Sequence, residues 1–294
     1  NVIVVMLDSL RADHLGCYGN SWIKTPNIDS FAKEATVFER AYAEGLPTLP
    51  VRTALLTGKY TLPNRGWQRL EPTDTSIAEI LWDKGYRTAL ITDTYHMHKP
   101  GMGYSRGFDT VIWIRGQESD PHIVDPSVKV DLNKWHEKNW CTPQYSKNIE
   151  RQKKSFIQYL KNRHWWRSEE DHFVARVFKA AAKWLEEQVK EGVKDRIFLW
   201  VDSFDPHEPW DPPEEYYKLY APPEYQDKPI IWGGGLTRDF TDLELRHIRA
   251  QYAGEVTLVD KWVGWFFNKL KELELWENTL IILLSDHGEP LGEH

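Results

Sequence analysis

Segments of strand length that are largely apolar alternate along this chain with segments of helical periodicity, and this alternation constrains the fold more than any other feature. A strand that is apolar on both faces must be covered on both faces, which is typical of parallel sheets with helices on either side. The sequence therefore predicts an α/β sandwich built on a large, mostly parallel sheet. The predicted strands cover 1–7, 87–92, 196–202 and 279–284.

Helices are predicted between these strands from the spacing of apolar residues and from residues typical of helix ends. Pro26 falls in the first turn of one of them, where its fixed φ angle suits a helix. Gly85 and Gly192 directly follow two others, as C-terminal glycines do. The predicted helices cover 25–35, 50–57, 76–84, 173–191 and 244–274.

One long segment, 116–171, interrupts the alternation. It is rich in Lys, Asn, Trp and His, and we predict that it forms an insertion over the active-site face of one catalytic domain spanning 1–294. The chain opens at Asn1 directly in a strand and finishes in a loop that follows one. We therefore expect residues upstream of Asn1 and a smaller C-terminal subdomain beyond residue 294.

Charge and hydropathy exclude several classes of partner. Lys and Arg number 37 against 44 Asp and Glu, a formal net charge of -7, so no broad basic surface is predicted for nucleic acid. The apolar runs are far shorter than the ~20 residues of a membrane helix, so no membrane span is expected. Cys17 and Cys141 lack the spacing of a zinc site or a disulfide framework. These features leave the location open (periplasmic, extracellular or cytoplasmic), and they allow a homo-oligomer.

Acidic residues and histidines follow the predicted strands, and ligands bind beyond the carboxyl ends of the strands in open α/β sheets. Carboxylate oxygens hold Mg²⁺ or Ca²⁺, and a neighbouring imidazole favours Mn²⁺ or Zn²⁺. The pattern predicts a divalent metal site, with a helix N-cap as the alternative for a single Asp. The polar residues that follow the strands are Asp8, Asp93, His96, Asp205, His207, Asp286 and His287.

Thr48 lies at the predicted start of a helix, because Pro50 suits its first turn. Free backbone amides and the helix dipole favour an anion at that position. Arg52 lies one turn further along the same face, from where it can reach a sulfate or phosphate oxygen or the Thr48 oxygen. Thr48 is therefore a candidate nucleophile, and the alternative is a threonine N-cap followed by a surface arginine.

Several blocks of this sequence resemble the sulfatases of the alkaline phosphatase superfamily, and they occur in the family's order. Thr48-x-Pro50-x-Arg52 is similar to the family signature Cys/Ser-x-Pro-x-Arg. The resemblance implies a sulfatase-like α/β/α sandwich and a hydrolase of ester bonds. The other blocks cover 8–19, 25–29, 205–210 and 285–289.

The resemblance also implies roles for individual residues. Arg52 would steady the nucleophile, His207 would contact the ester and assist the leaving group, and His96 would contact the sulfate or phosphate group. Tyr95 and Lys99, close to His96 in the sequence, are further candidates for substrate binding. The implied ligands of the metal are Asp8, Asp286, His287 and Thr48.

Two departures from the family pattern shape the prediction. Family sulfatases convert the signature Cys or Ser into formylglycine, whereas Thr48 is expected to stay unmodified and to form a covalent ester that water cleaves. Ser9 replaces the second Asp of the usual pair, so one divalent ion (Mn, Ca, Mg or Zn) is predicted and a second is not. Thr94 replaces the family lysine, which makes the site less cationic.

The sequence therefore predicts a metal-dependent hydrolase that attacks sulfate or phosphate esters with Thr48, on a small-molecule or glycan substrate. The unmodified threonine favours phosphomonoesters, phosphodiesters or phosphonates. Three alternatives stay open: a sulfatase acting on a sulfated sugar or aryl sulfate, a phosphoryl or phosphoethanolamine transferase, and a non-catalytic relative that binds sulfated glycans.

Overall fold

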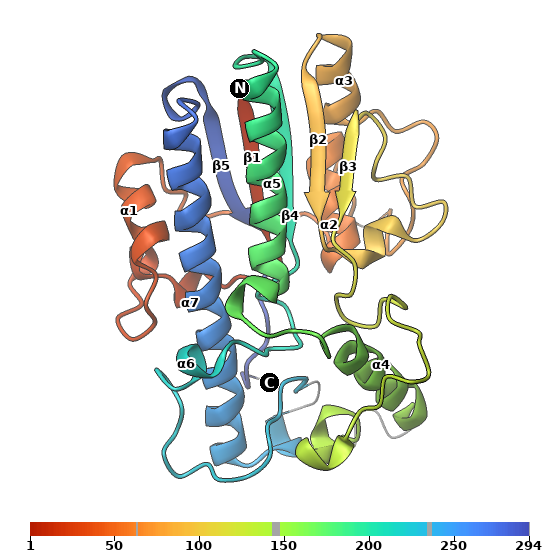
Figure 1. Cartoon of the computed structure of the whole chain (residues 1–294), viewed down its shortest axis with the longest axis vertical. Coiled ribbons are helices and arrows are strands. Elements are labelled where there is room, and N and C mark those ends of the chain that lie inside the picture. Colours follow the sequence, from red (N-terminus) through yellow and green to blue (C-terminus); the bar gives the residue numbers. More distant parts are fainter. Residues whose placement is uncertain (63, 143–147, 234–236, 294) are drawn as a thin grey trace.

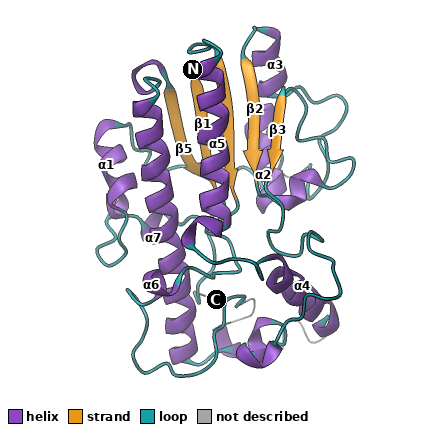
Figure 2. Cartoon of the chain, viewed as in Figure 1, coloured by secondary structure: helices purple, strands orange, loops and turns teal. Residues whose placement is uncertain are grey.

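The computed structural model describes residues 1–62, 64–142, 148–233 and 237–293. Within them, five strands form one parallel sheet in the order β3-β2-β4-β1-β5 (Figures 1 and 2). The predicted α/β sandwich is confirmed. The strands are β1 (Val2–Leu7), β2 (Arg87–Thr92), β3 (Thr110–Trp113), β4 (Ile197–Ser203) and β5 (Leu280–Ser285).

Helices cover both faces of this sheet, as alternate strand residues show. Ile3 and Val5 belong to a core shared with α1, α5 and α7, whereas Val4 and Met6 pack in a second core with α2 and α3. None of the described helices is long and apolar enough for a membrane span. The helices are α1 (Pro26–Glu34), α2 (Thr48–Thr57), α3 (Ile77–Asp83), α4 (Ile149–Asn162), α5 (Phe173–Lys190), α6 (Glu214–Tyr217) and α7 (Asp242–Glu272).

Hydrogen-bonding side chains mark where two of these helices begin. Ser76 accepts the Glu79 backbone N–H while its own N–H donates to the Glu79 carboxylate, and Thr241 and Glu244 form the same reciprocal pair before α7. Such capping boxes satisfy backbone donors that the first turn leaves free. The predicted limits of these two helices accordingly lie within two residues of the observed ones.

Three elements have no counterpart among the predicted ones. β3 is four residues long and only partly buried, and α6 is a single turn. α4 lies inside 116–171, where no helix is predicted, and it is largely polar, with Phe156, Tyr159 and Leu160 on its buried side. Short or mostly polar elements carry too few apolar repeats for periodicity to identify them.

The strands point with their carboxyl ends towards the half of the molecule that contains α4, α6 and the first half of α7 (Figure 1). This half has a core of its own around Phe156, Tyr159 and Ile231. Four tryptophans pack around that core, as expected for large rings that serve burial. They are Trp135, Trp140, Trp166 and Trp232.

The environment of His247 in α7 leads us to expect a loss of folding stability in acid. The Ile230 N–H donates to its Nε2 at 3.0 Å, and its Nδ1 lies 2.7 Å from the Tyr217 hydroxyl, so the neutral ring uses both nitrogens. Burial lowers the pKa of His247 to about 4. As the pH falls from about 6.5, His247 takes up a proton in the unfolded chain but stays neutral in the folded chain. The free energy of unfolding therefore falls by up to about 3 kcal/mol by pH 4.

Urea unfolding at pH 7 and pH 4.5 checks this prediction. We expect His247→Gln to lose less stability between the two pH values than the parent protein. An equal loss in both proteins would contradict the assignment of this acid sensitivity to His247.

Candidate active site

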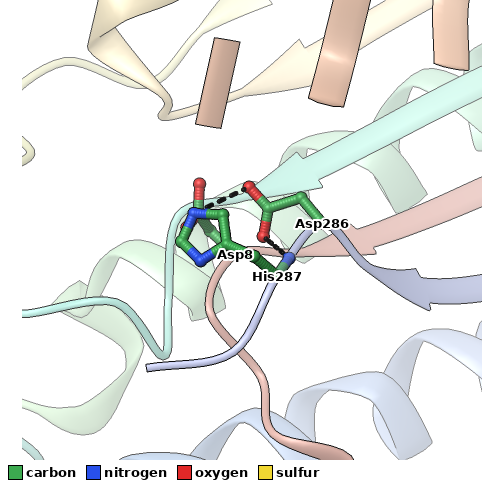
Figure 3. A group of neighbouring side chains, drawn as sticks. All are labelled: Asp8, Asp286 and His287. Atoms are coloured by element: carbon green, nitrogen blue, oxygen red, sulfur yellow. Dashed lines mark hydrogen bonds and ion pairs between the residues drawn. The ribbon is translucent and has the colours of Figure 1, made fainter. Parts of the chain in front are cut away.

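Asp8, Asp286 and His287 come together at the carboxyl edge of the sheet (Figure 3). Leu7 at the end of β1 pairs with Ser285 at the end of β5 in parallel register, so the residue after each strand emerges at the same edge. One ligand atom from each of the three side chains lies within 4.8 Å of the others. Strand pairing thus joins residues 278 positions apart in the chain.

His287 presents a free nitrogen to the two carboxylates. Its Nδ1 lies 2.9 Å from the Gly288 carbonyl oxygen, which can only accept, so Nδ1 carries the hydrogen. The unprotonated Nε2 is then left 3.7 Å from Asp8 Oδ1 and 3.6 Å from Asp286 Oδ2. This Nε2 is buried and has no hydrogen-bond partner among the described residues. Two carboxylates and an oriented imidazole lone pair fit a divalent cation of the Mn²⁺ or Zn²⁺ type.

Ser9 orients this group without adding a carboxylate. Its backbone N–H donates to Asp286 Oδ1 at 3.0 Å, and its hydroxyl donates to Asp8 Oδ1 at 3.0 Å. Its φ is 59°, a left-handed conformation that is uncommon outside glycine. Residues held in this region tend to cluster at functional sites.

Arg52 is fully buried and joins three carboxylates, so the surface-arginine alternative is wrong. Its Nε and Nη2 donate to both oxygens of Asp202 at 2.9 and 2.6 Å. Its Nη1 donates to Asp286 Oδ2 at 2.6 Å, and Nη2 lies 3.0 Å from Asp8 Oδ2. Burial opposes ionisation of Asp286, but Arg52 holds the pKa of that carboxyl below its usual range. Burial and the neighbouring Asp286, in contrast, raise the pKa of Asp8.

Asp202 is a site residue that the predicted set lacks. It belongs to β4 and is fully buried, in a strand whose every residue is buried. A charged side chain inside an otherwise apolar run is itself a signal, because buried carboxylates need a partner. That partner is Arg52, and Thr94 also donates its hydroxyl to Asp202 at 2.8 Å.

Thr48 is the first residue of α2 and is 3% exposed. Pro47 occupies the N-cap position with no side-chain cap hydrogen bond, so the threonine N-cap alternative is wrong. The Thr48 main-chain carbonyl accepts from Arg52 Nη1 at 3.3 Å. One guanidinium therefore touches both the start of α2 and the carboxylates Asp8 and Asp286.

His207 lies near this group and is held as a proton donor. Its Nδ1 donates to the Glu208 carbonyl at 2.9 Å, and its ring centre is 6.5 Å from that of His287. Burial would lower the pKa of His207, but Glu208, Asp8 and Glu118 outweigh it and raise the pKa to about 10. His207, Glu208 and Glu289 have ligand atoms within 4.8 Å of one another, a second group that was not predicted.

The other predicted substrate-binding residues form a separate set around His96. Its Nε2 lies 2.5 Å from Glu118 Oε2, and its ring packs on Tyr95 with 4.6 Å between ring centres. Lys99 places its ammonium group 4.6 Å from the centre of the Tyr95 ring. Glu118, in the predicted insertion, is a second site residue that was not predicted.

Asp93 and Asp205, which also follow strands, hold loops together. Asp93 accepts the Phe204 backbone N–H at 2.7 Å, and Asp205 accepts that of Val174 at 2.9 Å. The Gln117 side-chain amide donates to Asp205 at 2.8 Å. These contacts anchor the start of α5 and the loop after β4 beside the site.

Comparison with known proteins points to one family. The relatives include an arylsulfatase of Clostridium perfringens (24% identical), the multifunctional alkaline phosphatase superfamily protein PehA of Trinickia caryophylli (26%) and the iduronate 2-sulfatase of Homo sapiens (25%). Each match covers 100% of this chain but only 64%, 64% and 56% of the relative, respectively. The chain thus spans less than two thirds of the length of these proteins.

Solved structures share the fold. The phosphonate monoester hydrolase of Agrobacterium radiobacter superposes with a TM-score of 0.72 at 23% identity, over 100% of this chain and 64% of that one. The family model described as Sulfatase matches residues 1–294, the whole of the chain. With this match and the resemblance of its sequence blocks, the chain belongs to the sulfatase family.

Proposed function

We propose that this chain is the catalytic part of a metal-dependent hydrolase of phosphate or sulfate esters, with Thr48 as the nucleophile. The observation that carries the proposal is the convergence on Arg52. This one buried side chain contacts the first residue of α2 and both carboxylates of the candidate metal group. Thr48 and the candidate metal ligands Asp8 and Asp286 therefore lie around the same arginine at the carboxyl edge of the sheet.

Asp8, Asp286 and His287 would hold the divalent cation, and Ser9 keeps both carboxylates oriented. Family members use such an ion, and bound at this group it would take up charge from the ester oxygens and lower the pKa of a hydroxyl that contacts it. The mixed oxygen and nitrogen donors favour Mn²⁺ or Zn²⁺ over Ca²⁺ or Mg²⁺. With no second aspartate at position 9, we propose one ion in this group.

The chain's own residues account for the remaining steps. The Thr48 hydroxyl loses its proton to solvent, and Oγ1 attacks phosphorus or sulfur in line, forming a covalent ester as the bond to the alcohol oxygen breaks. His207 gives its proton to that oxygen, and the raised pKa of His207 keeps the proton available at neutral pH. Water then cleaves the ester to Thr48.

Phosphate or phosphonate esters are the favoured substrates, because an unmodified threonine matches a phosphoryl-enzyme route. The phosphonate monoester hydrolase fold neighbour is consistent with this choice. A sulfatase acting on a sulfated sugar or aryl sulfate is the second candidate, supported by the family match and by relatives named as sulfatases. A transferase would use the same residues but pass the group to an alcohol instead of water.

A panel of nitrophenyl phosphate, phosphodiester, phosphonate and sulfate esters tests the proposal on the full natural protein. We expect turnover of a phosphorus ester to exceed that of the sulfate ester, to stop after chelation, and to return with one Mn²⁺ or Zn²⁺ per chain. Faster turnover of the sulfate ester would select the sulfatase instead. A metal-loaded protein that cleaves none of the four esters would overturn the hydrolase.

A further inference from the structure

His96 and Glu118 form a close pair beside the candidate active site. His96 follows β2 in a short 3₁₀ turn, Tyr95–His98, and Glu118 lies far along the chain at the start of 116–171. His96 Nε2 and Glu118 Oε2 are 2.5 Å apart, and the two side chains are only 16% and 15% exposed. A contact this short between a carboxylate and an imidazole is typical of a charge-assisted hydrogen bond.

The backbone around Glu118 is held in an unusual conformation that aims this carboxylate at the ring. Its φ is 46°, in the left-handed region. This conformation is energetically unfavourable for residues other than glycine. The neighbouring Gln117 accepts the Glu118 N–H at 3.2 Å through its side-chain oxygen. The Gln117 amide nitrogen in turn donates to Asp205 at 2.8 Å. The start of the segment is thus tied to the loop after β4.

The other nitrogen of His96 has no hydrogen-bond partner in the described part of the chain. Nδ1 is buried, and no described residue forms a hydrogen bond with it. The ring cannot easily turn, because it packs edge-on against Trp67 at 4.9 Å and beside Tyr95 at 4.6 Å. A buried polar atom without a partner is costly and usually indicates a missing ligand or water.

Glu118 is a negatively charged neighbour of the His96 ring. Burial opposes ionisation of Glu118, but the hydrogen bond with His96 and the positive charges of His207 and Lys99 hold the pKa of that carboxyl below its usual range. An ionised carboxylate can only accept a hydrogen bond, so Nε2 carries a hydrogen. When the ring carries a second hydrogen, that hydrogen is on Nδ1, and the unpartnered atom is then a donor for an anion.

A shared aromatic neighbour brings His96 close to His207 of the candidate active site. The Phe204 ring packs on His207 with 4.2 Å between centres, and its centre lies 6.3 Å from that of His96. Both histidines therefore contact one aromatic side chain on the loop after β4. Thr94, two residues before His96, lies 3.5 Å from the Arg52 guanidinium.

We propose that Glu118 is a positioning residue that holds the His96 ring through its Nε2–H, so that Nδ1–H of the imidazolium binds an oxygen of the tetrahedral anion in the substrate. This inference deepens the proposed function and rests on it. It assigns a contribution to substrate binding to the segment 116–171.

Glu118→Gln tests the proposal, because glutamine keeps the size and a hydrogen-bonding oxygen but removes the charge. Glu150→Gln in α4 is the matched control, since Glu150 is exposed and belongs to the same segment. We expect Glu118→Gln to raise KM for the ester about tenfold or more, with a smaller change in kcat, as for loss of one charged hydrogen bond. Glu150→Gln should match the parent protein.

Nuclear magnetic resonance of the His96 ring nitrogens supplies a readout that does not require turnover. Inorganic phosphate should shift the Nδ1 signal in the parent protein, and the shift should need at least about tenfold more phosphate in Glu118→Gln. If Glu118→Gln fails to fold, His96→Asn replaces it, with the same expected rise in KM. Kinetics and phosphate response equal to those of Glu150→Gln would overturn the proposal.

The two proposals fail in different ways. Loss of turnover in Thr48→Ala with an intact phosphate response at His96 supports both. An active Thr48→Ala protein would remove the nucleophile, but a phosphate response that depends on Glu118 would still establish the anion site. No phosphate response in the parent protein would remove the anion site and leave the role of Thr48 standing.

Discussion

Replacing Thr48 with alanine should lower kcat for the best ester substrate by at least about 10³-fold, because the group that forms the covalent ester is lost. The methyl side chain fits the space, and α2 begins after Pro47 without a cap from Thr48. We therefore expect the fold to survive. Steady-state kinetics on the substrate found in the ester panel measure the effect.

Thr48→Ser is the control, because it keeps a hydroxyl at the same position and should retain turnover. Calorimetric titration with Mn²⁺ or Zn²⁺ should give nearly the same affinity in the parent and in Thr48→Ala, since Asp8, Asp286 and His287 are unchanged. Mass spectrometry of acid-quenched parent protein should find the transferred group on Thr48. An alanine variant within about tenfold of the parent kcat would eliminate Thr48 as nucleophile.

Replacing Arg52 with methionine should lower the free energy of unfolding by about 3–5 kcal/mol, the cost of removing one partner from a buried ion cluster. The Asp8, Asp202 and Asp286 side chains that surround Arg52 are all 0% exposed. Without the guanidinium, these carboxylates must either take up protons or remain charged without a partner. Urea unfolding at pH 7 on metal-free protein measures the loss.

Lys59→Met is the matched control for this variant. Lys59 also pairs with a buried aspartate, Asp74, but its own side chain is 48% exposed and Arg65 still pairs with Asp74. The control should therefore lose less than about 1 kcal/mol. Adding Asp202→Asn to Arg52→Met should recover part of the loss, because one uncompensated charge is removed. A loss below about 1 kcal/mol in Arg52→Met would show that the cluster is not held together by this arginine.

Most of the fold follows from local patterns that tertiary contacts do not override. The four predicted strands match β1, β2, β4 and β5 to within one residue at each end. Their apolar composition indicates burial on both faces, and hydrophobic packing against helices on each side of the sheet provides that burial. The four residues of β3 were missed because their pairing with β2 depends on a neighbour and not on their own pattern.

The candidate site was predictable in part. Asp8, Asp286 and His287 follow strand ends, and strand ends of a parallel sheet meet at one edge, so their convergence could be expected. Arg52 was expected to act on Thr48 or a substrate oxygen, and the structure shows it bound to Asp202, Asp8 and Asp286. Which carboxylate a buried guanidinium selects depends on the sheet order, which no local pattern reports.

Residue order and type determine much of this protein: the strand lengths, the starts of the capped helices and the presence of a hydroxyl-bearing residue at the start of a helix. These follow from short-range sterics, backbone hydrogen bonding and the burial of apolar side chains, which act over a few residues. Tertiary structure alone decided that Glu118 contacts His96, that Asp202 pairs with Arg52, and that His96 Nδ1 finds no hydrogen-bond partner among the residues described. Such contacts join distant segments through the order of the strands and the path of residues 116–118, so their geometry arises only when the whole chain is packed.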